Sequence, residues 1–106
     1  MLTKEQIKQY QEDGFVIPDF KMSENDLLEI EKKHNQLISK FPEYKNYCPA
    51  VLLKDESFLK YCLDEKIISF VEQLLGKYFA LWNSSFFAKP PYDGFETPWH
   101  QDGQYW

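Results

Sequence analysis

The sequence contains no arginine: all twelve of its basic side chains are lysines. A site that binds a carboxylate or a phosphate through a bidentate guanidinium is therefore excluded within these residues. Seventeen acidic residues against the twelve lysines give a net charge of −5. Such a surface repels a phosphate backbone, so we expect no nucleic-acid partner.

Histidine and cysteine are also scarce, with two residues of each type, His34 and His100 and Cys48 and Cys62. Two cysteines at this spacing form neither a disulfide framework nor a zinc ribbon. We interpret both as small apolar packing residues that are kept reduced in a cytosol, in preference to a redox pair.

Long hydrophobic runs are missing as well, and no segment approaches the ~20 apolar residues of a membrane-spanning helix. The first residues lack the basic-then-apolar pattern of a secretory signal. We therefore expect a cytoplasmic protein with no membrane partner. The 43% hydrophobic and 18% aromatic content excludes a disordered tail, and 106 residues make one domain.

Three helices are predicted from their capping residues. Thr3 and Gln6 form a capping box for a helix that runs to about Asp13 and stops at Gly14. A second helix begins at Ser23 and is ended by Pro42, which excludes Phe41 from the helical region. A third helix is capped by Asp64 and ended by Gly76, and Asp55 caps a short helical turn before it. The apolar stripe of the second helix consists of Leu27, Ile30, His34, Leu37, Ile38 and Phe41.

After Gly76 the pattern changes from helical to extended. Residues 79–89 are rich in aromatic and small side chains without helical spacing, which predicts a long strand. Residues 90–94 read as a turn, and residues 95–106 as a second extended stretch. The sequence therefore predicts an α+β chain, with helices first and strands last.

His100 and Asp102 form a His-x-Asp motif in this second stretch. On a strand, residues two apart point to the same face, so both side chains could converge on one ion. One imidazole and one carboxylate make two thirds of the 2-His-1-carboxylate triad of ferrous oxygenases. A surface histidine beside a solvated aspartate is the alternative. By the same parity Trp106 shares their face and could form a wall for the substrate, with core packing as its alternative.

Three segments of the chain together resemble the phytanoyl-CoA dioxygenase family, a branch of the iron(II)- and 2-oxoglutarate-dependent oxygenases. These segments are residues 2–6 with 12–16 (LTKEQ and EDGFV), residues 88–91 (AKPP) and residues 99–105 (WHQDGQY). Their order and spacing are similar to those of the amino-terminal half of family members, so the resemblance covers essentially the whole chain.

The resemblance implies a double-stranded β-helix (jelly roll) behind the helices, of which this chain would hold only the first strands. It also implies Fe(II) held by His100 and Asp102, with 2-oxoglutarate and O2 as cosubstrates for hydroxylation of a small organic or acyl substrate. Family members add a second histidine ligand and a 2-oxoglutarate-binding arginine downstream. This sequence has no arginine, and His34 lies on a helical apolar stripe, where a hydrogen-bonded boundary histidine is the better interpretation. Lys89 could bind the carboxylate as a point charge, or it could be a solvated strand end. A small non-catalytic α+β binding or interaction module remains the alternative to the oxygenase.

Overall fold

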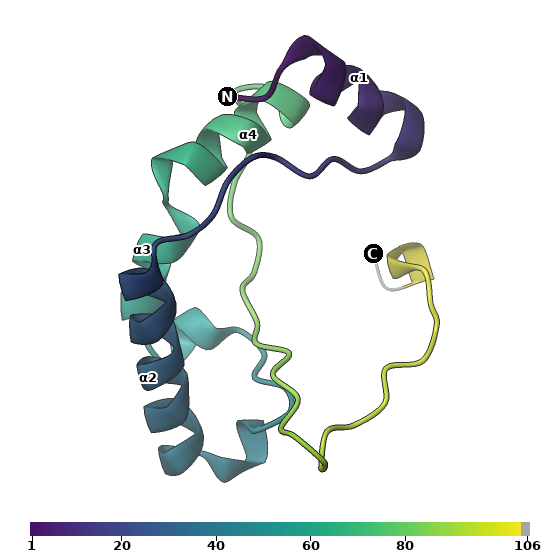
Figure 1. Ribbon diagram of the computed structural model, residues 1–106. Coiled ribbons are helices and arrows are strands. Elements are labelled where there is room, and N and C mark those ends of the chain that lie inside the picture. Colours follow the sequence, from purple (N-terminus) through teal and green to yellow (C-terminus); the bar gives the residue numbers. More distant parts are fainter. Residues whose placement is uncertain (105–106) are drawn as a thin grey trace.

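The computed structural model describes residues 1–104 as four α-helices and four short 3₁₀ turns joined by long irregular segments (Figure 1). α1 (Lys4–Asp13) begins as predicted, because the Thr3 hydroxyl accepts the Gln6 N–H at 3.2 Å and the Gln6 side chain accepts the Thr3 N–H at 2.9 Å. Gly14 ends it in the left-handed conformation, with φ 79°.

The second helix also has the predicted ends. α2 (Glu24–Lys40) is capped by Ser23, whose hydroxyl accepts the Asp26 N–H at 3.1 Å. It stops before the proline that opens η1 (Pro42–Tyr44), because the residue before a proline avoids helical geometry.

The middle of the chain makes short turns before the last long helix. η2 (Val51–Leu53) is followed by η3 (Glu56–Phe58) and α3 (Leu59–Cys62). α4 (Glu65–Leu75) is capped by the Asp64 carboxylate, which accepts two backbone N–H groups, and Gly76 ends it. The predicted helical turn at residue 55 and the predicted helix from residue 64 are therefore confirmed.

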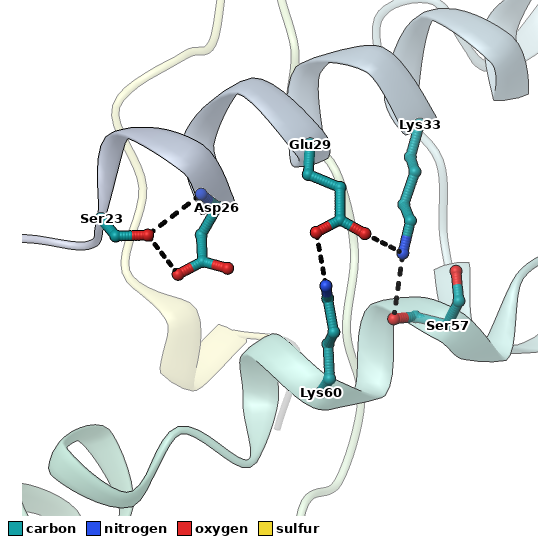
Figure 2. A network of polar contacts seen from close by, with 6 residues as sticks. All are labelled: Ser23, Asp26, Glu29, Lys33, Ser57 and Lys60. Atoms are coloured by element: carbon teal, nitrogen blue, oxygen red, sulfur yellow. Dashed lines mark hydrogen bonds and ion pairs between the residues drawn. The ribbon is translucent and has the colours of Figure 1, made fainter.

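The main core lies where α2 meets the η2–α3 region. Its buried members are Leu37, Cys48, Val51 and Phe58. Partly buried side chains surround them: Ile30, Phe41, Tyr44, Leu52, Tyr61 and Phe86. Polar contacts join the same elements at the surface, because Glu29 and Lys33 of α2 pair with Lys60 and with the backbone carbonyl of Ser57 (Figure 2).

A second contact ties the start of the chain to α4. The Gln73 side chain accepts the Leu2 N–H at 2.7 Å and donates to the Leu2 carbonyl at 3.1 Å, and Leu2 is buried. The rings of Phe20 and Phe70 pack edge to face 5.9 Å apart. Figure 1 accordingly shows α1 beside α4, at the opposite end from the loop that follows α2.

The predicted strands are wrong, and with them the α+β class and the partial jelly roll. Residues 1–104 contain one isolated antiparallel bridge, between Cys48 and Phe86, and no sheet. Residues 79–89 are extended, but their backbone pairs only through this bridge and through the Ser84 carbonyl, which accepts the Val51 N–H at 2.9 Å. A strand requires a neighbouring segment that pairs with its N–H and C=O groups, and here the pairing stops after the one bridge to Cys48. The fold is mostly helical.

The chain packs loosely over its second half. Its accessible surface is 9086 Å², against roughly 6,200 Å² for a compact monomer of 12.7 kDa. The radius of gyration is 16.0 Å, where a compact chain of this length has about 13 Å. Large apolar side chains stand exposed after α4, namely Tyr78, Leu81, Trp82, Phe87, Tyr92, Phe95 and Trp99. In the described part of the chain, no helix has the length and hydropathy needed to cross a membrane.

Candidate metal site

His100 and Asp102 lie next to each other near the end of the described chain. His100 is in an irregular segment, and Asp102 is the first residue of η4 (Asp102–Gln104). His100 Nε2 is 3.2 Å from Asp102 Oδ1. The strand on which we based their convergence is absent, so the bend of the backbone into η4 brings the two side chains together instead.

The orientation of the imidazole is set by a second contact. His100 Nδ1 lies 2.8 Å from the backbone carbonyl oxygen of Pro98. A carbonyl can only accept, so Nδ1 carries the proton that it donates. Nε2 is then the nitrogen that faces the Asp102 carboxylate.

The separation of the pair is that of a hydrogen bond or ion pair, and it also matches two adjacent positions on a metal ion. Two donors about 2.1 Å from a metal and at right angles are roughly 3 Å apart, close to the observed 3.2 Å. Metal-binding histidines usually donate their other N–H to a carbonyl or a carboxylate, as His100 does to Pro98. Within residues 1–104, however, no three His, Cys, Asp or Glu side chains are grouped to hold an ion. A metal ion held by this pair would need further ligands.

The approach to the pair is anchored by two consecutive residues that the sequence analysis missed. The Lys45 ammonium pairs with the Asp93 carboxylate, and the Asn46 side chain accepts the Phe95 N–H at 3.2 Å. Between these anchors lies Gly94, where an added Cβ would come within 2.8 Å of the Lys89 Cβ. Only glycine, which has no Cβ, allows the backbone at residue 94 to come this close to Lys89. The contacts join residues almost fifty positions apart, so no local pattern could have revealed them.

Two of the other predicted site residues, Lys89 and His34, lie in the described chain, and both are outside the segment of residues 98–104 that carries the pair. Lys89 is exposed at the start of the turn, which agrees with the alternative interpretation of this residue as solvated. Trp106 lies outside the described residues. His34 is on α2, with its ring centroid 4.9 Å from that of Phe86.

His34 therefore belongs to the packed face of α2, as we expected, and not to the metal site. Within the described chain its Nε2 atom is buried without a hydrogen-bond partner, so the expected hydrogen bond at this atom is absent. Burial lowers the pKa of His34 because the charged imidazolium loses hydration.

Both cysteines are free thiols in the structure. Cys48 is fully buried in the core, and burial raises the pKa of its thiol. A raised pKa keeps the thiol protonated and unreactive, which agrees with a packing role.

No protein-family model, curated protein or solved structure matches this chain.

Proposed function

We propose that this chain contributes His100 and Asp102 as two protein ligands of Fe(II) in a 2-oxoglutarate-dependent dioxygenase. The observation that carries the proposal is the 3.2 Å approach of His100 Nε2 to Asp102 Oδ1, with Nδ1 engaged by the Pro98 carbonyl. The sequence resemblance to phytanoyl-CoA dioxygenases supports the same two residues. The helical fold leaves the assignment intact, because the pair is formed by local backbone geometry and not by a sheet.

Each residue of the pair has a defined task. Pro98 accepts the Nδ1 proton, which fixes the tautomer and presents the Nε2 lone pair to the metal. Asp102 supplies a hard anionic oxygen beside it, and the exposure of its side chain leaves the remaining metal positions accessible. Bound iron would supply the activation of O2 and 2-oxoglutarate for hydroxylation of a small-molecule C–H bond.

Ferrous binding by the chain tests this proposal directly. Under anaerobic conditions, Fe(II) and 2-oxoglutarate should give the visible charge-transfer band of a chelated 2-oxoglutarate. We expect His100→Ala and Asp102→Ala each to weaken Fe(II) binding by at least about tenfold, because the loss of a direct ligand costs no less than the loss of an outer partner. Glu96→Ala is the matched control, since it removes a nearby carboxylate and should leave the affinity unchanged.

Two outcomes would contradict the assignment. One is the absence of Fe(II) binding by the wild-type chain, and the other is equal affinity in the Asp102 and Glu96 variants. Turnover is a separate matter. Because no arginine is present and no third ligand lies in the described chain, we expect no succinate release from these residues alone.

A further inference from the structure

The segment after α4 has one paired edge and one free edge around Phe86. Phe86 exchanges two backbone hydrogen bonds with Cys48, at 2.9 and 3.0 Å, and the Ser84 carbonyl accepts the Val51 N–H. In an antiparallel pair, a residue directs its N–H and C=O to one side of the strand, and the next residue directs them to the other side. Residues 84 and 86 therefore face the loop that contains Cys48, and residues 83, 85 and 87 face away from it.

The residues on the free edge have no backbone partner. In the described chain, the backbone N–H and C=O groups of Asn83, Ser85 and Phe87 take part in no hydrogen bond. A hollow of about 370 Å³ lies beside this edge and is lined by Ala80, Leu81, Trp82, Asn83, Ser85 and Phe87. Unpaired edges of this kind are places where another extended segment adds on through backbone hydrogen bonds. The occupant that fits the edge is therefore a strand.

The composition of the segment favours a second copy of the same chain as the source of that strand. Residues 78–88 (YFALWNSSFFA) include no charged residue, although 27% of the whole chain is charged. Segments that are rich in aromatic residues and free of charge and proline pair readily with identical segments. A partner recognised by its charge would find no ion pair here, and two identical edges place no like charges opposite each other.

The exposed surface is large enough for such a dimer. It exceeds the roughly 6,200 Å² of a compact monomer of this mass by roughly 2,900 Å². A standard interface buries about 800 Å² of each partner, and an obligate dimer buries about 1,000 Å² or more of each. Trp82 and Phe87, beside the free edge, are 82% and 73% exposed, so pairing there would cover large apolar side chains.

We propose that two copies of this chain pair antiparallel through residues 83–87, about a two-fold axis beside Ser85. In this register Ser85 lies opposite Ser85 of the second copy, and Asn83 lies opposite Phe87, so all three free residues of each copy are paired. A two-fold contact closes on itself, because the segment has one free edge and the contact uses it in both copies. His100 and Asp102 take no part, so the inference does not depend on the proposed function.

Sedimentation equilibrium of the metal-free 106-residue chain measures this association. We expect an equilibrium between monomer and dimer without larger species. Each chain carries a net charge of −5, while the proposed contact is uncharged. Raising the NaCl concentration from about 50 to about 500 mM should therefore strengthen the dimer, because salt screens the repulsion between the two copies. A contact between opposite charges would be weakened instead.

Two substitutions of Ser85 separate the backbone contact from the side chain. Ser85→Pro removes the N–H that each copy donates across the axis and that the single chain does not use. We expect about tenfold weaker dimerisation, the value of the two hydrogen bonds lost by symmetry. Ser85→Ala keeps this N–H and is the matched control, which should dimerise like the unaltered chain. Circular dichroism shows whether both variants keep the helices.

A disulfide tests the register independently. Opposite residues in a hydrogen-bonded antiparallel pair have Cα atoms about 5.5 Å apart, within the roughly 4.4–6.8 Å that a disulfide spans. Cys62→Ser first removes the partly exposed native thiol. In that background Ser85→Cys should form a covalent dimer under mild oxidation, whereas Ser39→Cys on the exposed face of α2 should not.

Four results would overturn the proposal. They are a chain that stays monomeric at millimolar concentration or forms larger species, a dimer that added salt weakens, equal dimerisation of Ser85→Pro and Ser85→Ala, and a Ser85→Cys variant that cross-links no better than Ser39→Cys. The cross-linking result does not depend on the proline variant, so the proposal stays testable if Ser85→Pro loses its helices.

Discussion

Replacing Phe58 by alanine tests whether the small cluster between α2 and α3 is the core of this chain. Phe58 is 4% exposed, and its ring lies 5.1 Å from Phe86 and 6.2 Å from Tyr61, measured between centroids. Removing a buried phenylalanine side chain typically costs 3–5 kcal/mol, and we expect a loss of at least about 3 kcal/mol here. Domains of this size are stable by only about 5–15 kcal/mol, and the large exposed surface places this chain toward the lower end.

Urea unfolding followed by circular dichroism at the helical minimum measures the loss. With a denaturant dependence of about 1–3 kcal/mol per molar, the unfolding midpoint should fall by at least about 1 M, or the helices should be lost without urea. Phe95→Ala is the matched control, because that side chain is 70% exposed and its removal should cost less than about 0.5 kcal/mol. If the two variants unfolded at the same urea concentration, the cluster would not be the core and the reasoning would be refuted.

Two further predictions concern pH. Because burial lowers the pKa of His34 below its usual 6.5, the unfolded chain binds more protons than the folded chain. Stability should therefore be full above pH 6.5 and decline as the pH falls below it. Urea midpoints across this range should show a shallower decline in His34→Gln, and identical slopes would contradict the prediction. Hydrogen bonds from Lys60 and then Lys33 lower the pKa of Glu29 from 4.5 to about 2, so its contribution is present above 4.5 and lost as the pH falls toward 2. Glu29→Gln should therefore lower the melting temperature at pH 7 but not at pH 2. High salt should reduce the loss at pH 7, because it screens the ion pairs. The control Glu31→Gln should have no effect at either pH.

The helix ends could be predicted because they depend on neighbours in the chain. Thr3 and Ser23 cap their helices through residues three positions on, and Gly14 adopts a left-handed conformation that costs other residues energy. Each of these choices is made within one turn of helix. The packed face of α2 is predictable for the same reason, since its period follows from helical geometry, although Leu27 of the predicted stripe is 53% exposed.

The strand prediction failed because extended backbone becomes a strand only beside another strand. The pattern of residues 79–89 predicts a strand from local preference alone, but the pairing partner that a strand needs is a property of the whole fold. Here the partner is a single residue, Cys48, that follows an irregular loop. Nothing in the sequence near either position indicates this bridge.

The candidate site likewise has some features that the sequence shows and others that only the folded structure shows. The sequence by itself determined that His100 and Asp102 lie two residues apart and that no arginine accompanies them. The bend into η4 that brings their side chains together is local, although the sequence pattern predicted a strand there. Only the tertiary structure decided that Lys45 and Asn46 anchor the turn leading to them. The physical reason is the range of the interactions: capping and helical periodicity act over three or four residues, whereas bridges, anchors and cavities join segments that approach each other only after the chain has folded.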